Sequence, residues 1–291
     1  MTATKLDPVQ QLKTLLAGAP IGVVGLGLMG GSLALDLRGL GFVVNGWVHR
    51  QATATRAKER GLVDAVDISA VHLQNCGLVV LALPLDQLIT PNEALVQAMP
   101  PGAVITDMGS VKAPVAAALA SRLPRFVPSH PMAGTAAAGV EAGVAGLFQG
   151  RPWVISPSGQ EDSTAVELVE ALALALGAKP VYCDAKAHDQ AVALISHLPV
   201  LAGAALLQSA ATGGHLARQL ASSGFADTTR VGGGNPQLGR LIAKSNRVAL
   251  MAALDLYNQE LKLIGQLIEA EQWDQLEQHL SCGQALRPEF L

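Results

Sequence analysis

Two short segments of the chain carry polar side chains suited to acid–base chemistry. Ser110 lies in Thr-Asp-Met-Gly-Ser-Val-Lys and His130 in Ser-His-Pro-Met-Ala-Gly-Thr, and both segments follow apolar runs typical of buried strands. His130 is the candidate general base, because an imidazole has an ordinary pKa of about 6.5. We expect Ser110 to hydrogen-bond this ring and fix its tautomer. Each residue alone also has a structural explanation: the serine can cap the following helix, and the histidine can be a satisfied residue at a strand end.

Two more polar residues stand out later in the chain. His197 lies in Ile-Ser-His-Leu-Pro, within residues 190–217, which contain no Asp, Glu, Lys or Arg. A lone histidine on an apolar helix is more often a core residue than a functional one. Arg230 precedes Val-Gly-Gly-Gly-Asn-Pro. Backbone N–H groups of a Gly-rich loop and a guanidinium together suit an anion, and the alternative is a plain interhelical loop with a surface arginine.

A glycine motif near the N-terminus predicts a dinucleotide site. Gly-Leu-Gly-Leu-Met-Gly follows the apolar run 21–24 and precedes a segment with helical apolar spacing. In this context the first glycine forms the tight turn, the second lets the pyrophosphate approach, and the third allows close helix–strand packing. The alternative is that the glycines serve packing alone. The predicted cofactor contacts are Gly25, Gly27, Leu28, Met29 and Gly30.

The end of the second predicted strand favours NADP over NAD. The sequence there is Val-His-Arg-Gln, 48–51, without the carboxylate that usually binds the ribose of NAD. Arg50 stands about 20 residues beyond the last glycine of the motif, where that carboxylate would be. A guanidinium can bind the 2′-phosphate of NADP in a planar, bidentate way. We assign His49 and Arg50 to the cofactor site, with a solvated residue at a helix start as the alternative for Arg50.

Apolar runs and helical segments alternate through the first part of the chain and predict a doubly wound α/β fold. Beyond residue 184 no strand pattern remains; the segments are helical and rich in Ala, Leu and Gln, with one Gly-rich break at 224–239. We therefore predict a Rossmann-type domain over 1–184, including a short helical lead-in, and a helical domain over 185–291. The predicted strands are 21–24, 42–48, 78–83, 103–106, 126–128, 153–155 and 179–182, and the predicted helices are 31–37, 53–60, 86–99, 111–122 and 164–176.

Composition excludes several classes of protein. The chain of 291 residues is 50% hydrophobic, 3% aromatic and 15% charged, with a net charge of −3, so it is neither disordered nor equipped to bind nucleic acid. Three scattered cysteines form no disulfide framework or metal cluster and fit a reducing compartment such as the cytoplasm. No signal peptide is indicated. Residues 190–217 carry too many polar groups for a favourable membrane span, so we expect a helix buried in protein.

Taken together, these motifs resemble the prephenate/arogenate dehydrogenases of tyrosine biosynthesis, and most of all the cyanobacterial NADP-dependent arogenate dehydrogenases. The resemblance implies a Rossmann domain followed by a helical domain that forms an intertwined homodimer. It also implies that His130 accepts the proton of the ring hydroxyl and that Ser110 hydrogen-bonds both. By the same resemblance Thr135 lines the substrate pocket, His197 is a second histidine of the cleft, and Arg230 holds the ring carboxylate.

The implied reaction is oxidative decarboxylation of arogenate to tyrosine, with hydride transfer to NADP and no metal. Prephenate is the alternative substrate, because residues 136–138 are all Ala where some relatives have a Glu to pair with the ammonium group of arogenate. Two other classes remain open. A β-hydroxyacid dehydrogenase would use a helical lysine, but Lys186, Lys244 and Lys262 lack its motif. A non-catalytic NADP sensor would not need Ser110, His130 and Arg230 together.

Overall fold

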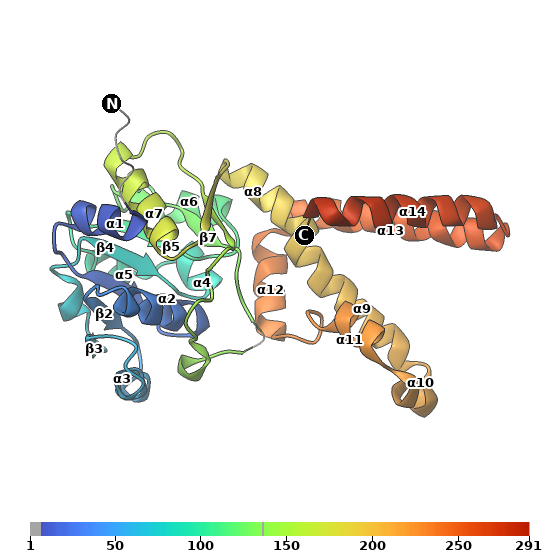
Figure 1. Ribbon diagram of the computed structural model, residues 1–291, viewed down its shortest axis with the longest axis horizontal. Helices are drawn as coiled ribbons and strands as arrows, with labels where there is room; N and C mark the ends of the chain where they lie inside the picture. The colour runs from blue at the N-terminus through green and yellow to red at the C-terminus, as the bar shows by residue number, and fades with distance from the viewer. Residues whose placement is uncertain (1–6, 136, 291) are drawn as a thin grey trace.

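A computed structural model describes residues 7–135 and 137–290 (Figure 1). Its α/β part contains a six-stranded parallel sheet in the order β3-β2-β1-β4-β5-β6, the arrangement of a doubly wound Rossmann-type sheet. The edge strand β3 is short and half-buried, and it is not among the strands predicted from the sequence. The strands of this sheet are β1 (Ile21–Val24), β2 (Val44–Trp47), β3 (Ala65–Asp67), β4 (Leu78–Leu81), β5 (Val104–Asp107) and β6 (Phe126–Val127).

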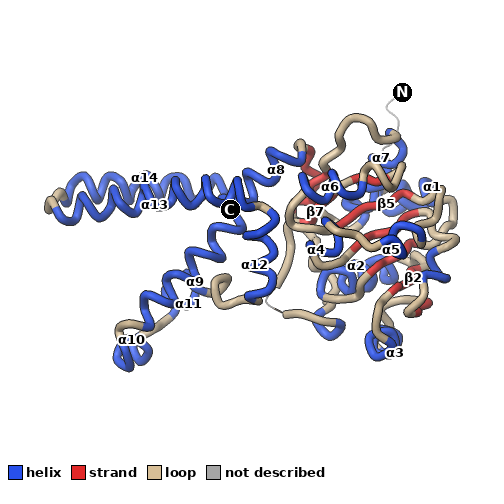
Figure 2. Tube along the Cα trace, turned by 180° about the vertical axis from the view of Figure 1, so that it is seen from behind, coloured by secondary structure: helices blue, strands red, loops and turns tan. Residues whose placement is uncertain are grey.

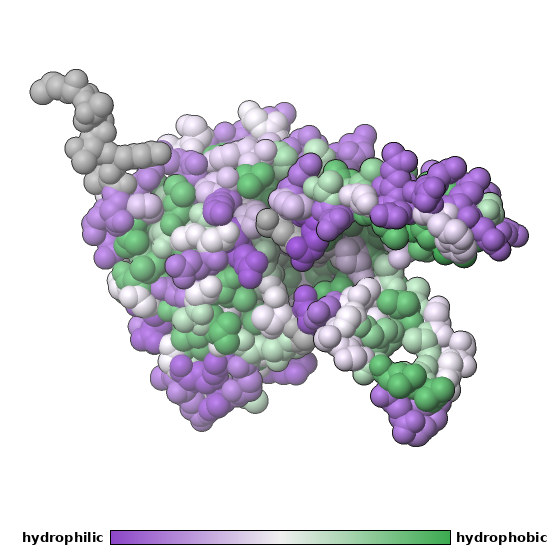
Figure 3. All heavy atoms as spheres, turned by 45° about the vertical axis from the view of Figure 1, so that its right-hand side comes forward, coloured by the Kyte–Doolittle hydropathy of each residue, from purple (hydrophilic) through white to green (hydrophobic). Residues whose placement is uncertain are grey.

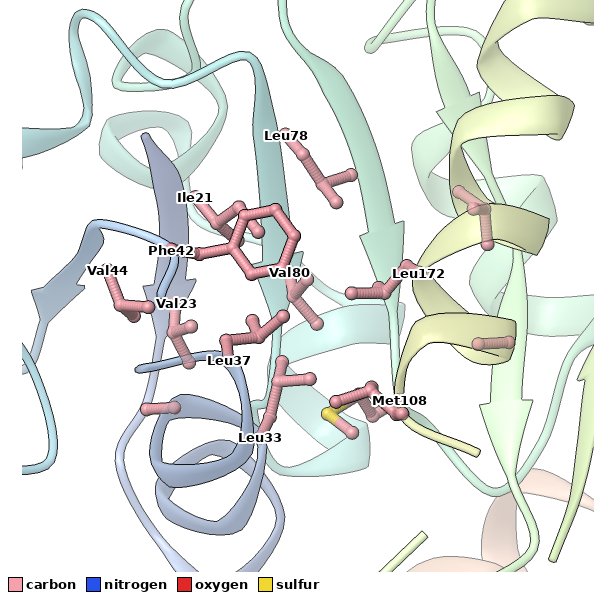
Figure 4. Packing of buried hydrophobic residues seen from close by; sticks show 14 of the residues in the cluster. Ile21, Val23, Leu33, Leu37, Phe42, Val44, Leu78, Val80, Met108 and Leu172 are labelled. Carbon is pink, nitrogen blue, oxygen red and sulfur yellow. The ribbon is translucent and has the colours of Figure 1, made fainter. Parts of the chain in front are cut away.

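The central strands are apolar throughout because both faces of the sheet are covered. Alternate residues belong to two separate cores: Val23 and Val80 to one, Val24 and Val79 to the other. Figure 4 shows the first core, with Leu33 from α2 and Leu172 from α7 against the sheet. The first core is covered by α1 (Pro8–Leu16), α2 (Leu28–Gly39), α3 (Gln51–Glu59) and α7 (Ser163–Ala175), and the second by the 3-10 helix η1 (Ala70–Leu73), α4 (Leu85–Ile89), α5 (Glu93–Gln97) and α6 (Ala113–Leu119).

The single helix expected over 86–99 is instead two short ones, α4 and α5. Pro91 explains the division, because proline disfavours helical conformation in the residue before it. Thr90 accordingly leaves the helical region, with φ −127° and ψ 66°. Asn92 then begins α5 by accepting a hydrogen bond from the backbone of Leu95 at 2.7 Å.

The last strands of the α/β part form a second, mixed sheet that the sequence analysis did not separate from the first. It consists of β7 (Ser129–Pro131), β8 (Pro152–Ile155) and β9 (Lys179–Tyr182), with β7 and β8 antiparallel and β8 and β9 parallel. The chain changes sheets at Pro128, which has no N–H to continue the ladder and whose carbonyl accepts from Ser156 at 2.9 Å. His130 therefore lies on β7, in the second sheet.

Residues 185–290 contain only helices among the described residues. Helix α8 (Ala185–Val192) passes through a π-helical turn (Ala193–His197) into α9 (Leu198–Ala211). Figure 2 shows two arms leaving the α/β part, one made of α9 with α10 and α11 and the other of α13 with α14. The remaining helices are α10 (Gly214–Leu220), α11 (Ser223–Thr229), α12 (Pro236–Ser245), α13 (Arg247–Glu269) and α14 (Trp273–Phe290).

Two expectations for the helical part differ from what the single chain shows. The break predicted at 224–239 is mostly helical, because α11 runs to Thr229 and α12 starts at Pro236. Asn235 caps α12, and proline is favourable in the first turn of a helix. The apolar helix is also not buried within one chain. By length and composition Ala185–Ala211 could cross a membrane, a property that it shares with core helices, yet only 28% of its most apolar window is buried.

Apolar side chains remain uncovered along both arms, and the surface is hollowed between the arms and the α/β part (Figure 3). Leu206 on α9, Met251 and Leu261 on α13 and Leu280 on α14 are all exposed. An exposed apolar surface of this extent marks an interaction site in a folded protein.

Candidate active site

The glycine turn after β1 has the geometry that a dinucleotide requires. Gly25 has a φ of +89°, and a Cβ there would lie 2.5 Å from the carbonyl oxygen of Ala82. A Cβ on Gly30 would lie 1.9 Å from the oxygen of Gly25, so the helix packs directly on the turn. By contrast, nothing lies within 4 Å of a Cβ on Gly27, the N-cap of α2. A pyrophosphate can therefore approach there.

The first residues of α2, Leu28 and Met29, follow Gly27 with no side chain capping the helix. Their backbone N–H groups have no partner within the helix, and such a terminus suits a phosphate. At the end of β2, His49 and Arg50 are both exposed. Arg50 is the N-cap residue of α3, and among the described residues its guanidinium forms no ion pair. The residues present at the turn fit a dinucleotide.

A buried ion pair joins the two segments that carry the candidate catalytic residues. Lys112 donates to the carboxylate of Asp107 and to the carbonyl of Ser129, the latter at 2.7 Å. The Asp107 carboxylate also accepts from the backbone of Gly109 at 2.8 Å, and the Ser129 hydroxyl donates to the Asp107 carbonyl at 2.8 Å. Burial lowers the pKa of Lys112, and the charge of Asp107 opposes that shift. The pair fixes the end of β5 against the start of β7.

His130 contacts a second histidine that the sequence analysis did not identify. Its Nδ1 lies 2.9 Å from Nε2 of His188 on α8, and the two rings meet edge to face at 77°. Nδ1 of His188 in turn lies 2.8 Å from Oδ1 of Asp189. The Asp189 carboxylate also accepts from the backbone N–H groups of Lys112 at 2.6 Å and Ala113 at 2.9 Å. The first helix of the helical part thus reaches the strand ends of the α/β part.

The structure does not show, among the described residues, the hydrogen bond expected between Ser110 and His130. Ser110 is half-buried, and Nδ1 of His130 bonds to His188 instead. The Ser110 backbone lies beside the ring of His197. Burial lowers the pKa of His130 well below its ordinary value, and electrostatic interaction with its neighbours His188, Lys112 and His197 lowers it further. His130 is therefore neutral at neutral pH, as a general base must be.

His197 is buried and held in one tautomer by Asn246 on α13. The Asn246 amide nitrogen donates to the carbonyl of Asp189 at 2.7 Å, which fixes the orientation of the amide, and it also lies 3.2 Å from Nδ1 of His197. Nδ1 must therefore accept, and the ring hydrogen is on Nε2. Burial lowers the pKa of His197 to about 4, against the opposing charge of Asp189. Nε2 has no partner in hydrogen-bonding geometry among the described residues, and the backbone of Ser110 lies near the ring and raises its pKa slightly against the effect of burial. His197 therefore presents a neutral donor on the side of Ser110.

The other two predicted substrate residues lie outside this buried cluster. Thr135 is exposed, and its hydroxyl accepts from the backbone of Ala137 at 3.2 Å. Arg230 is exposed at the end of α11. One glycine after Arg230 serves packing: a Cβ on Gly232 would lie 2.2 Å from backbone atoms of Gly203 and Ala204 in α9. That close approach, rather than an anion nest, explains at least this glycine of the motif.

Sequence reasoning missed Lys112, His188, Asp189 and Asn246. A signal was available for one pair: the chain has seven histidines, and His188-Asp189 stands immediately before the uncharged stretch 190–217. Lys112 and Asn246 carry no comparable signal, because single polar residues of these types are usually solvated. Only the three-dimensional arrangement shows that they are buried and paired.

Two family models match almost the whole chain. Residues 33–182 match the model described as prephenate dehydrogenase, nucleotide-binding domain, and residues 184–282 match prephenate dehydrogenase, dimerization domain. Among curated proteins, the chain is 30% identical over 276 residues to the cyclohexadienyl dehydrogenase of Zymomonas mobilis, covering 92% of this chain and 94% of that protein.

Solved structures agree with these matches. The arogenate dehydrogenase of Synechocystis superposes with a TM-score of 0.81 at 39% identity, over 94% of this chain and 100% of that one. The prephenate dehydrogenase of Aquifex aeolicus, in complex with hydroxyphenyl propionate and NAD+, gives a TM-score of 0.87 at 27% identity, over 94% and 98% of the two chains. With a Rossmann-type sheet, a helical part that matches the dimerization domain and relatives of this kind along nearly its full length, the chain is an oxidoreductase that belongs to the prephenate dehydrogenase family.

Proposed function

We propose that the enzyme converts arogenate to tyrosine with NADP+ as the hydride acceptor. The observation that carries the proposal is the pair of buried, neutral histidines with opposite hydrogen-bonding capacity. His130 can offer a lone pair on Nε2, and His197 offers an Nε2–H donor without a described partner. A cyclohexadienol needs both an acceptor for its hydroxyl proton and donors for its oxygen as that oxygen becomes a carbonyl.

Each of the candidate site residues has its own role in the proposed reaction. His130 takes the hydroxyl proton while the carbinol carbon loses its hydride, and the bound nicotinamide accepts that hydride. The bond from the ring to the carboxylate then breaks, CO2 leaves, and its electron pair completes the aromatic ring as the ketone oxygen gains a proton. His197 and Ser110 hydrogen-bond the oxygen during these changes. Arg230 holds the ring carboxylate, and Thr135 lines the pocket once substrate is bound.

The proposed choice of NADP depends on Arg50. It is the exposed N-cap residue of α3, three residues after the end of β2, and it has no ion-pair partner among the described residues. His49, also exposed, is its neighbour. The arogenate assignment is supported by the 39% identity to the Synechocystis arogenate dehydrogenase. One observation favours prephenate as a second candidate: Ala137 and Ala138 supply no carboxylate for the ammonium group of arogenate.

The same proposal includes the organisation of the molecule. Residues 1–184 form the cofactor domain and 185–291 the substrate and dimerisation domain. A second copy covers the exposed apolar surface on α9, α13 and α14, which lies in the region matched by the dimerization-domain model. The homodimer acts in the cytoplasm, the compartment that its biosynthetic relatives and its three free cysteines suit.

The test is a panel of initial rates with arogenate, prephenate and 3-hydroxy acids, each with NADP+ and NAD+. We expect the highest kcat/KM for arogenate with NADP+. The variant His130→Gln should lower kcat by about 10²–10⁴ and leave NADP+ binding intact. His215→Gln, an exposed histidine on α10, is the matched control and should match the wild type. Faster turnover of prephenate would select the second candidate, and cofactor binding without turnover of any compound would refute the proposal.

A further inference from the structure

We propose that His188 and Asp189 form a positioning pair that holds His130 in the tautomer with its hydrogen on Nδ1. Nε2 of His130 is then the lone pair that receives the substrate proton. The inference rests on the proposed function in one respect only, namely that His130 is the base. Neither residue of the pair touches the reacting atoms; both act through His130.

The hydrogen atoms can be assigned one by one from Asp189. An ionised carboxylate only accepts hydrogen bonds. Its Oδ1 accepts from the backbone of Lys112 at 2.6 Å, so Nδ1 of His188, 2.8 Å from the same oxygen, must carry a hydrogen. With His188 neutral, its Nε2 has the lone pair. Nδ1 of His130, 2.9 Å away, must then be the donor. A neutral imidazole has one ring hydrogen, so Nε2 of His130 is left as an acceptor.

The surroundings of Asp189 fit a His188 ring that carries a single hydrogen. A carboxylate beside an imidazole ordinarily draws a second proton onto the ring. Here the two Asp189 oxygens already accept backbone hydrogen bonds from Lys112 and Ala113. The His188 side chain is only 1% exposed, so a charge on its ring would lack water around it. The ammonium of Lys112 adds a positive charge in the same buried region, and its partner Asp107 is already bound to it.

The pair also supports the charge that appears during the reaction. When His130 accepts a proton on Nε2 it becomes an imidazolium, and its bond from Nδ1 to His188 becomes a charge-assisted hydrogen bond. The carboxylate of Asp189 stands behind His188 and stabilises that cation. In a Ser-His-Asp triad the carboxylate hydrogen-bonds the catalytic histidine directly. Here a second imidazole, that of His188, lies between the carboxylate and the base. Because His130 is on β7 and His188 is on α8, the pair also ties the base to the helical domain.

Three variants separate positioning from packing. His188→Gln places an amide oxygen near the site of Nε2, where it can still accept from His130. His188→Leu fills similar space without an acceptor. His279→Gln breaks another histidine–carboxylate contact, between His279 and Glu260 on α14 and α13, and serves as the matched control. Unfolding midpoints of all three report any loss of stability separately from activity.

The measurement is 15N NMR of the histidine rings in the intact protein, with the His130 signals assigned from His130→Gln. We expect the wild type and His188→Gln to show hydrogen on Nδ1 of His130, and His188→Leu to show a shift toward the Nε2–H form. The kcat of His188→Leu should fall by roughly 10²–10⁴ with little change in KM, and His188→Gln should recover most of it. His279→Gln should leave both readouts unchanged.

Two results would overturn the inference. One is hydrogen on Nε2 of His130 in the wild type; the other is an unchanged tautomer and kcat in His188→Leu. Failure of the proposed function has a different signature, because an active His130→Gln would remove the base while leaving the NMR assignment of the tautomer standing.

Discussion

Asn246 donates a hydrogen bond to the carbonyl of Asp189 across 2.7 Å, and so joins α13 to α8 inside the protein. Both helices belong to the helical part, yet the bond lies beside the histidines that the strand ends and α8 bring together. Through its backbone and its side chain, Asp189 reaches His197 by way of Asn246 and His130 by way of His188. One residue therefore borders both parts of the candidate site.

Replacing Asn246 with Ala should damage both stability and substrate handling. The substitution leaves the Asp189 carbonyl and Nδ1 of His197 buried without their donor, which costs about 1–3 kcal/mol of unfolding free energy for an unsatisfied group. His197 can then exchange tautomers, so we expect kcat/KM to fall as well. Urea denaturation and steady-state rates measure the two effects. The control is Asn92→Ala, which removes a cap from α5 at a cost of about 1 kcal/mol and should leave kcat/KM unchanged.

Replacing Arg50 with Ala should reduce the use of NADP+ selectively. Loss of a charged hydrogen-bond partner to the 2′-phosphate removes about 1.5–3 kcal/mol, so KM for NADP+ should rise at least about tenfold while KM for NAD+ stays constant. Lys58→Ala, an exposed cation on the same helix, is the control for general charge effects. An equal rise in KM for both cofactors would contradict the assignment.

The stability of the protein should fall as the solution is acidified from about pH 6.5 to about pH 4. A histidine in the unfolded chain has a pKa near 6.5, whereas burial lowers the pKa of His197 in the folded protein to about 4. In this window the unfolded state binds more protons, so lower pH favours unfolding. Urea midpoints at several pH values should show a smaller slope for His197→Gln than for the wild type. Identical slopes would remove His197 as a contributor.

Replacing Gly232 with Ala should displace the loop that carries Arg230. The new Cβ would meet backbone atoms of α9 at 2.2 Å, and a backbone neighbour cannot rotate away as a side chain can. We expect a loss of about 1–3 kcal/mol in unfolding free energy and a raised KM for the ring acid, because the arginine moves with the loop. Gly224→Ala in α11 has nothing within 4 Å of its Cβ and should stabilise that helix by up to about 1 kcal/mol.

The sequence predicts those parts of the molecule that depend on local pattern. Apolar runs locate the central strands, and the glycines at 25, 27 and 30 locate the cofactor turn, because each reflects a local requirement for burial or for close approach. The change of sheet at Pro128 cannot be predicted in this way, because a short apolar run does not indicate which strand it will pair with. The sequence singles out His130 by its place at a strand end, but its partner His188 is 58 residues away, and no local spacing relates the two. In the sequence, Lys112 cannot be distinguished from a surface lysine. Only the structure shows that it is buried and bound to Asp107 and Ser129.

The π-helical turn at Ala193–His197 determines which way the second histidine faces. A regular helix advances about 100° per residue, so positions 188 and 197 would point to nearly opposite sides. The wider turn accommodates one extra residue before Pro199, which cannot donate to the preceding ladder, and so rotates His197 by about 100° back toward the side of His188. Deleting the exposed Ile195 should restore regular winding and leave His197 on the side of His188, because the deletion removes the one residue that the wide turn accommodates. The winding of this one turn therefore decides on which side of the helix His197 lies.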